Sequence, residues 1–178
     1  MFQIRPAKLS DAGDIYNIWS RGWRYAYGKI LSPEFLEKRV GPEAVQEKIQ
    51  KFPEKMRKEA DKGNIFLVLT DDDKVIGFVS GGAPDSPECK CDSELDMLYL
   101  DTEYIGCGVG KLLFKTFATE MKKRGLNTFG LMCFSDNKSM GFYKKMGGVV
   151  TVERPSSAKF ENTMASFIEF NIDEVLER

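Results

Sequence analysis

Three glycines at alternate positions, Gly106, Gly108 and Gly110, separate a segment with the pattern of a strand from one with the pattern of a helix, within "LDTEYIGCGVGKLLFKTF" (100–117). Glycine beside regular structure costs stability unless the backbone needs an unusual dihedral angle or a close approach. The amides of a glycine-rich turn at a helix N-terminus form an anion cradle, and the helix dipole adds about half a positive charge. The alternative is a tight turn without a ligand, and the glycines alone leave both interpretations open.

The two common nucleotide-binding motifs do not fit this segment. A Walker A loop requires glycine five residues before its Gly-Lys pair and Ser or Thr after it, where this chain has Ile105 and Leu112. A dinucleotide fingerprint that starts at Gly106 requires a third glycine where Lys111 stands. A nucleotide-dependent enzyme is therefore disfavoured.

Hydrophobic periodicity predicts helices early in the chain and an alternation of strands and helices later. The expected strands are 2–7, 64–70, 74–83, 93–101, 127–134, 148–155 and 163–173. Helices are expected from Ser10 or Asp11, after the Ser-Pro and Gly-Pro pairs near 33 and 42, from about Val109 to Gly125, and within 135–148. This pattern predicts one α/β domain, residues 1–178, built on a central sheet.

Charge and cysteine content exclude several classes of function. Lys and Arg number 26 against 27 Asp and Glu, whereas nucleic-acid-binding domains usually carry a basic excess. The longest apolar run is "IFLVL" (65–69) and no signal-like segment opens the sequence, so we expect a cytoplasmic protein without a membrane partner. Histidine is absent, and the four cysteines lack zinc spacing, so free thiols and no metal are expected.

Two blocks resemble the GCN5-related N-acetyltransferase (GNAT) superfamily. "IGCGVG" (105–110) is similar to the family's Arg/Gln-x-x-Gly-x-Gly/Ala loop, and "FSDNKSMGFYKKMGG" (134–148) is similar to its N-x-x-A-x-x-F-Y-x-k-x-G-F block. The order of elements agrees from residue 2 to about 172, and "W-x-x-A-Y" (23–27) resembles a helical segment on the substrate side. The resemblance implies a central mixed, mostly antiparallel sheet of about seven strands flanked by helices.

The same resemblance implies acetyl-CoA as cofactor and a set of residues that bind it. The pantetheine arm is expected along the backbone of Leu98 and Leu100, with the Leu100 amide donating to the thioester oxygen. The pyrophosphate is expected on the amides from Gly106 to Lys111, and Asn137 is expected to hydrogen-bond the pantetheine arm. The implied cofactor-binding residues are Leu98, Tyr99, Leu100, Ile105, Gly106, Cys107, Gly108, Val109, Gly110, Lys111, Asn137, Phe142, Tyr143 and Lys145.

Three positions depart from the family pattern. Ile105 stands at the Arg/Gln position, Ser139 at the Ala position and Gly148 at the last Phe position. Ile105 removes a polar side chain from the phosphate loop, so we expect weaker or altered cofactor binding.

The candidate catalytic residues are Tyr143 and Glu94. A phenol with a pKa near 10 is protonated at neutral pH and donates to a departing thiolate, although a bare Tyr143 would be interpreted as aromatic packing. Glu94 and Asp96 share a face of the central strand by its two-residue period, and Glu94 matches the family's glutamate position. Solvated surface acids and a water chain acting as the base are the alternatives.

Aromatic residues of the first helix offer a weaker substrate prediction. Trp23 and Tyr27, with Asp96, are the candidates for the acceptor side, because aromatic faces attract ammonium groups. Packing in the core is the alternative, and it is the expectation for Trp19.

The function predicted from the sequence is transfer of an acetyl group from acetyl-CoA to a primary amine by direct attack in a ternary complex. The alternative is a non-catalytic acyl-CoA-binding or sensing module on the same fold. Polyamines, peptide N-termini, lysine and aminoglycosides all fit as acceptors, and a homodimer is possible.

Overall fold

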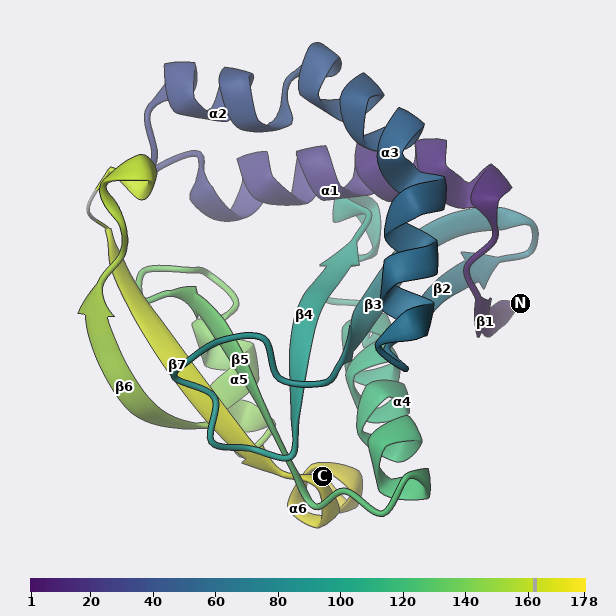
Figure 1. Ribbon diagram of the computed structural model, residues 1–178, viewed down its shortest axis with the longest axis vertical. Helices are drawn as coiled ribbons and strands as arrows, with labels where there is room; N and C mark the ends of the chain where they lie inside the picture. Colours follow the sequence, from purple (N-terminus) through teal and green to yellow (C-terminus); the bar gives the residue numbers. More distant parts are fainter. Residues whose placement is uncertain (162) are drawn as a thin grey trace.

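A single mixed sheet organises the molecule in the computed structural model, which describes residues 1–161 and 163–178 (Figure 1). The strand order is β1-β2-β3-β4-β5-β7-β6, and each neighbouring pair is antiparallel except β4–β5. The predicted seven-stranded, mostly antiparallel sheet is confirmed. The strands are β1 (Phe2–Pro6), β2 (Ile65–Asp71), β3 (Lys74–Gly82), β4 (Ser93–Leu100), β5 (Thr128–Phe134), β6 (Val149–Pro155) and β7 (Met164–Asn171).

The helices, the last one excepted, begin close to the predicted starts. They are α1 (Ala12–Tyr27), α2 (Pro33–Val40), α3 (Pro42–Asp61), α4 (Val109–Lys123), α5 (Met140–Lys145) and α6 (Ile172–Glu177), with 3-10 turns at Leu9–Asp11, Thr102–Tyr104 and Ala158–Phe160. The Ser32 hydroxyl accepts a hydrogen bond of 3.2 Å from the Phe35 amide, and Pro33 follows at the first helical position. This cap satisfies an amide that would otherwise lack a partner, which is why α2 starts there.

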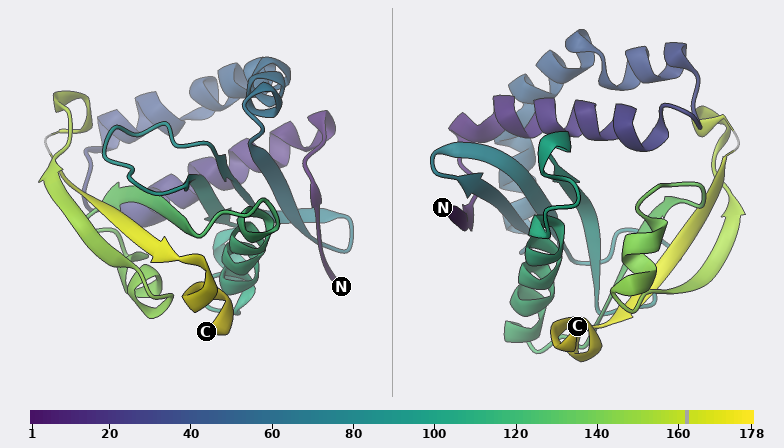
Figure 2. Two further views of the ribbon diagram at one scale, coloured as in Figure 1. Left: turned by 60° about the horizontal axis from the view of Figure 1, so that its bottom comes forward. Right: turned by 180° about the vertical axis from the view of Figure 1, so that it is seen from behind.

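Helices cover both faces of the sheet. Helices α1 and α3 lie on one face and α4 lies on the other (Figures 1 and 2). Ile15 and Phe52 are fully buried in the first layer together with Phe78 of β3. Leu113 and Phe117 are fully buried in the second layer. The i, i+4 spacing of Leu113 and Phe117 places both on one side of α4. With buried residues in both layers, the sheet is enclosed on both sides.

The C-terminal segment differs from the sequence prediction. Residues 172–173 were expected to close the last strand, whereas Ile172 begins helix α6. The Asn171 side chain accepts hydrogen bonds from the amides of Asp173 and Glu174, 2.9 and 3.2 Å away. Ile172 and Val175 are fully buried. An Asn cap followed by two buried apolar residues favours a helical turn over further extension of the strand.

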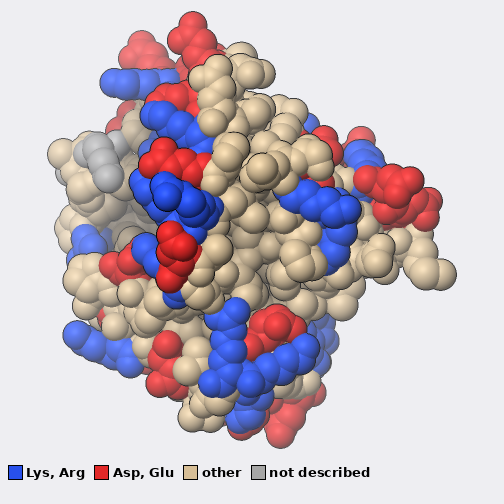
Figure 3. All heavy atoms as spheres, turned by 45° about the vertical axis from the view of Figure 1, so that its right-hand side comes forward, with Lys and Arg blue, Asp and Glu red and all other residues tan. Residues whose placement is uncertain are grey.

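Charges of both signs cover the surface. Figure 3 shows Lys and Arg side chains interspersed with Asp and Glu on the face that it displays, without a continuous basic stripe. No helix among the described residues combines the length and the apolar character that crossing a membrane requires.

Candidate active site

A cleft opens where strands β4 and β5 separate. The two strands pair in parallel at Ser93–Phe129 and Glu94–Gly130, and no further pair is formed between them in the part of the chain that the structure describes. Beyond Glu94 they diverge, as Figure 1 shows, and a cavity of about 580 Å³ lies between them. A cavity of this volume accommodates a cofactor-sized ligand. Its wall comes from β4, β5, the end of α1, the glycine loop, α5 and Arg178.

A β-bulge in β4 sets which side chains face this cavity. Ser80 of β3 pairs with Met97, and the next residue, Gly81, pairs with Leu95, so Asp96 is an extra residue on β4. The apolar pattern inverts across the bulge, because Leu95 and Leu98 pack into the same layer although three positions separate them. The bulge therefore turns Asp96 out of the regular ladder, and Asp96 lines the cavity. The sequence pattern did not predict this irregularity.

The backbone of β4 presents amides to the cleft. The Asp101 amide donates to the Ile76 carbonyl of β3 over 2.7 Å. Successive amides of an extended strand point to opposite edges, so the Leu100 and Leu98 amides point away from β3, toward the cleft. This is the edge of β4 along which the family resemblance implies the pantetheine arm.

The glycine loop forms an open cradle at one end of the cavity. Gly106 and Gly108 have φ of 88° and 84°, in the left-handed region where a Cβ atom is unfavourable. Their amides have no hydrogen-bond acceptor among the described residues. Gly110 serves a different purpose, because a Cβ there would lie 3.2 Å from Leu100 Cδ1. Close approach of α4 to β4 and an unusual backbone thus explain the three glycines together.

Most of the predicted cofactor-binding residues line this one cavity, and two do not. Cys107 is exposed and lies outside the cavity wall, and Val109 is buried in the core beneath α4. Their side chains therefore make no part of the wall. The predicted residues that do line it are Leu98, Tyr99, Leu100, Ile105, Gly106, Gly108, Gly110, Lys111, Asn137, Phe142, Tyr143 and Lys145.

Tyr143 lies in the cavity wall against the aromatic core. Its side chain is 7% exposed, and its ring lies 6.2 Å from that of Phe114 and 6.3 Å from that of Phe170. Burial raises the pKa of its hydroxyl, and the nearby Cys133 and Tyr99 raise the pKa further. The ring therefore packs in the core while the phenol keeps its proton at the cavity surface, and the role of Tyr143 as general acid stays a prediction.

Asn137 links the two sides of the cleft. Its Nδ2 donates to the Tyr27 hydroxyl over 3.1 Å, and its Oδ1 accepts from the Ser139 amide over 2.8 Å. Asn137 therefore precedes α5 as a turn residue, because the helix expected within 135–148 starts only at Met140. One N–H of its amide remains for a ligand. Because Tyr27 accepts this bond, its own hydroxyl proton is free to point into the cavity.

Asp96 has the properties of a base at neutral pH. It is exposed to the open cavity, but the surrounding walls restrict its hydration, and this desolvation raises the pKa of its carboxyl to about 7. Nearby Glu94, Glu59 and Asp85 raise the pKa further, and Lys55 opposes them. A carboxyl with this pKa exchanges its proton readily at physiological pH.

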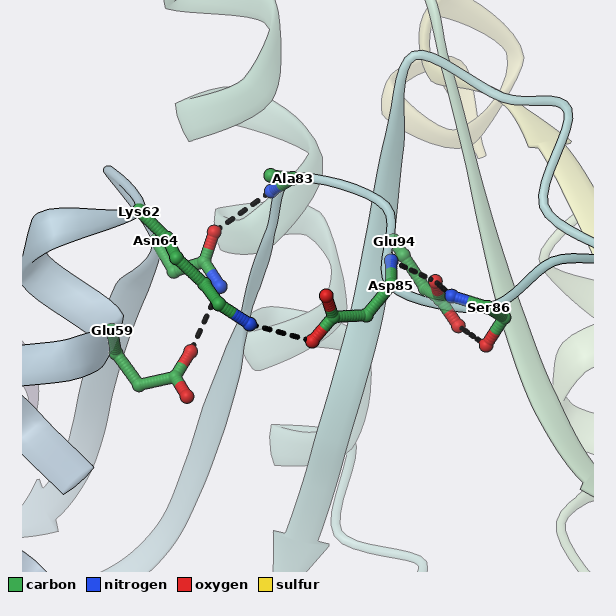
Figure 4. A network of polar contacts seen from close by, with 7 residues as sticks. All are labelled: Glu59, Lys62, Asn64, Ala83, Asp85, Ser86 and Glu94. Carbon is green, nitrogen blue, oxygen red and sulfur yellow. Dashed lines mark hydrogen bonds and ion pairs between the residues drawn. The ribbon is translucent and has the colours of Figure 1, made fainter.

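Glu94, the predicted catalytic base, has a different position. Its side chain is 5% exposed and does not line the cavity. Its carboxylate accepts hydrogen bonds from the Asp85 and Ser86 amides, 2.9 and 2.8 Å away, and from the Ser86 hydroxyl (Figure 4). Glu94 therefore anchors the loop between β3 and β4. Counting along the strand selected it because the bulge at Asp96 is invisible in the sequence.

Replacing Glu94 with glutamine tests this structural role. A glutamine Nε2 would face a backbone donor, so the free energy of unfolding should fall by about 1–3 kcal/mol. The melting temperature should then decrease by about 2–4 °C for each kcal/mol. Thermal unfolding measures this loss, and the turnover number of the folded variant should remain close to that of the wild type. If the Glu94→Gln variant were as stable as the wild type but had no turnover, Glu94 would be the catalytic base.

The aromatic residues of α1 divide between core and cavity. Tyr27 lines the cavity, whereas Trp23 is buried outside its wall, with its ring 4.9 Å from that of Tyr27 and Arg39 stacked 5.1 Å away. The prediction that Trp23 contacts the substrate is not supported by this position, because the helix turns its ring into the core. Trp19 is buried in the core as expected.

Cys133 and Arg178 are among the residues of the cavity wall that the sequence reasoning missed. Cys133 of β5 is a buried thiol whose burial raises its pKa to about 12. Arg178 reaches the wall from the end of α6, far from the glycine loop in sequence. The alternation of β5 would have placed Cys133 on one face, but no local signal points to Arg178.

The possible metal-ligating side chains do not cluster in the described part of the chain. No group of three or more Cys, Asp or Glu side chains there is placed to hold a metal ion. Cys89, Cys91, Cys107 and Cys133 are free thiols.

Comparison with known proteins supports one family. A family model described as "Acetyltransferase (GNAT) family" matches residues 14–148. The chain is 27% identical over 161 residues to the uncharacterized N-acetyltransferase YuaI of Bacillus subtilis, covering 90% of this chain and 86% of the relative. It is 28% identical over 149 residues to a spermidine N(1)-acetyltransferase of Thermoplasma acidophilum, covering 82% and 86% of the two chains.

Solved structures agree in fold. The PaiA N-acetyltransferase of Thermoplasma acidophilum, solved with coenzyme A, superposes with a TM-score of 0.74 at 22% identity and covers 96% of this chain and 99% of that one. YncA of Salmonella typhimurium, a putative acetyltransferase solved with acetyl-CoA, superposes with a TM-score of 0.69 at 18% identity and covers 97% and 95%.

Proposed function

This chain belongs to the acetyltransferase (GNAT) family, as an acetyl-CoA-dependent N-acetyltransferase, and on that premise we propose that its acceptor is a small polyamine. The observation that carries the proposal is the arrangement of one cavity. An amide cradle stands at one end of it, the phenol of Tyr143 lies in its wall, and a carboxyl that titrates near neutrality, that of Asp96, faces it. These are the groups that acetyl transfer to an ammonium group requires.

The residues of the cavity fit acetyl-CoA, which supplies an activated acetyl thioester when bound. The amides of Gly106 and Gly108 have no acceptor among the described residues, so they are available to bind a polyanion. Lys111 and Lys145 add positive charge to the same cavity. The apolar side chains of the wall, among them Leu98 and Phe142, suit an extended pantetheine arm. The Leu100 amide, which points into the cleft, is the proposed donor to the thioester oxygen.

Asp96 and Tyr143 divide the proton transfers between them. Asp96 removes a proton from the acceptor ammonium group, directly or through a water molecule. The amine nitrogen then bonds to the acetyl carbon in a ternary complex, and the carbon–sulfur bond breaks. Tyr143 donates its hydroxyl proton to the departing thiolate, and the phenol recovers a proton from solvent. The nitrogen loses two protons in all, one to Asp96 before the attack and one to solvent once it is bonded to the acetyl carbon. The thiolate gains one proton from Tyr143, so the reaction releases one net proton and balances.

The surroundings of Asp96 favour a cationic acceptor. Four carboxylates gather at this end, those of Asp96, Glu94, Glu59 and Asp85. Lys55 lies near them, and Lys62 is paired with Asp85 over 2.7 Å. The excess of negative charge attracts a molecule that carries several ammonium groups. A relative named as a spermidine N(1)-acetyltransferase gives this class independent support.

Thermal unfolding and thiol release test the two parts of the proposal. Acetyl-CoA at 100 times its dissociation constant should stabilise the folded chain by about 2.7 kcal/mol. That gain corresponds to a rise in melting temperature of several degrees. Thiol release should be fastest with spermidine or spermine, and slower with a peptide that offers an N-terminal amine and a lysine. Increasing ionic strength should raise KM for the polyamine, because screening weakens its attraction to the carboxylates.

Each negative result has a different meaning. Turnover of the peptide without turnover of polyamines would overturn the acceptor class and leave the enzyme in place. Binding of acetyl-CoA without turnover of any amine would support a non-catalytic acyl-CoA-binding module instead.

A further inference from the structure

The phosphate loop lacks a polar side chain where its family pattern has one. Ile105 is 40% exposed and lines the cavity beside the glycine cradle. An isoleucine side chain donates no hydrogen bond to a phosphate. Where it is exposed to water, it also gains no stabilisation from burial. The loop therefore needs another donor if it is to bind phosphate groups as strongly as a loop with arginine.

Helix α6 brings the chain to this position. The side chains of Ile172 and Val175 are fully buried and anchor α6 in the core. Asp173 forms an ion pair of 2.8 Å with Lys122 of α4. All the views in Figures 1 and 2 show the C-terminal end between α4 and α5. Helix α6 therefore starts beside the last turn of α4, and its end brings Arg178 within reach of Lys111 in the first turn of α4.

Several contacts hold Arg178 at the cavity wall. Its carbonyl oxygen accepts a hydrogen bond from Lys111 Nζ over 2.6 Å, and its Nη1 donates to the Lys145 carbonyl over 3.3 Å. Its Nε lies 2.8 Å from the position that a Cβ of Gly147 would occupy, and Gly147 has φ of 91°. The backbone at Gly147 therefore makes room for the guanidinium. The bond to Lys145 uses one of its five N–H donors.

Cations outnumber acidic side chains in the cavity wall. Lys111, Lys145 and Arg178 bring three cations near the glycine loop, and a fourth, Lys138, lies over the ring of Tyr25. Asp96 is the only carboxylate in the cavity wall among the described residues, and it belongs to the group with Glu59 and Asp85 at the acceptor end. The end with the cradle is thus prepared for a multiply charged anion.

We propose that Arg178 supplies the guanidinium that binds a phosphate group of acetyl-CoA in place of the absent side chain at position 105. A guanidinium suits this role because its planar fork matches two phosphate oxygens. The inference rests on acetyl-CoA as the donor and is independent of the acceptor. The same chemistry serves the pyrophosphate or the 3′-phosphate, and the experiment separates the two.

Calorimetric titration with coenzyme A provides the test. R178Q keeps a polar side chain and removes the charge, so coenzyme A should bind about tenfold or more weakly than to the wild type. R57Q is the matched control, because Arg57 is exposed on α3 away from the cavity, and it should bind like the wild type. Titration with dephospho-coenzyme A identifies the phosphate. A loss with both ligands assigns the pyrophosphate, and a loss with coenzyme A alone assigns the 3′-phosphate.

A second variant tests whether Arg178 replaces the missing side chain. In the R178Q background, I105R should recover most of the lost affinity, and R178K should bind between R178Q and the wild type. Melting temperatures without ligand verify that each variant is folded. Equal affinity of folded R178Q and the wild type would overturn the inference. If the wild type failed to bind coenzyme A, the assignment of acetyl-CoA as cofactor would be wrong. If it bound coenzyme A without transferring acetyl groups, the proposed function would be wrong and the inference on Arg178 would stand.

Discussion

Replacing Tyr143 with phenylalanine should lower kcat by a factor of about 10²–10⁴, the usual contribution of a positioned general acid. The ring that packs against Phe114 and Phe170 is kept, so the fold and the affinity for acetyl-CoA should change little. The physical reason is the loss of the proton that burial holds on the phenol until a thiolate develops beside it. Steady-state rates of thiol release measure the effect, together with the melting temperature.

Two other tyrosines make this result specific. Tyr16 is equally buried but lies in the core outside the cavity, so Tyr16→Phe is the matched control and should keep its turnover number. Tyr27 lines the cavity, and its hydroxyl proton is free because it accepts a bond from Asn137. A large loss in Tyr27→Phe with none in Tyr143→Phe would transfer the acid role to Tyr27. Equal losses in Tyr16→Phe would indicate general damage to the core.

Replacing Asp96 with asparagine should also reduce kcat by about 10²–10⁴, and in addition it should change the pH profile. The pKa of Asp96 is about 7, above the ordinary value of an aspartate. Below that pH the carboxyl is protonated and does not accept a proton from the acceptor. In the wild type, kcat/KM should therefore fall about tenfold for each pH unit below 7. The inflection near pH 7 should disappear in the variant.

The neighbours of Asp96 offer a control on this assignment. Glu94, Glu59 and Asp85 raise its pKa, and Lys55 lowers it. Lys55→Met should therefore move the inflection to higher pH, and Glu59→Gln should move it to lower pH. A wild-type profile that is flat between pH 6 and 8 would contradict the role of Asp96. So would full activity of the asparagine variant.

The elements of the fold were largely predictable because they depend on local signals. Pro33 and Pro42 stand at the first positions of their helices, and the change from a helical period to strand alternation after Gly63 marks the start of the sheet. These signals act over a few residues, where caps, prolines and periodicity decide the backbone. Helix α6 was missed because its stability comes from burial of Ile172 and Val175 rather than from its length.

The candidate site was predictable where backbone conformation carries the chemistry. Gly106 and Gly108 are visible in the sequence, and both adopt left-handed dihedral angles that glycine permits. The site was not predictable where packing decides direction. The family resemblance put Glu94 in the role of base, and period-two alternation placed Asp96 on the same face. A single bulge instead presents Asp96 to the cavity and leaves Glu94 to anchor a loop. Trp23 was assigned to the substrate side from its residue type, although helix packing turns it into the core.

By itself the sequence determined the order of elements, the glycine cradle before α4, the phenol at position 143 and the family to which the chain belongs. Each of these depends on residues that are neighbours along the chain. Only the tertiary structure decided which carboxylate faces the cavity, that the Tyr27 hydroxyl accepts a bond from Asn137, and that Arg178 stands beside a loop about 70 residues earlier. Those relations arise from bulges, helix docking and long-range contacts, whose geometry depends on the whole packed chain rather than on any short segment.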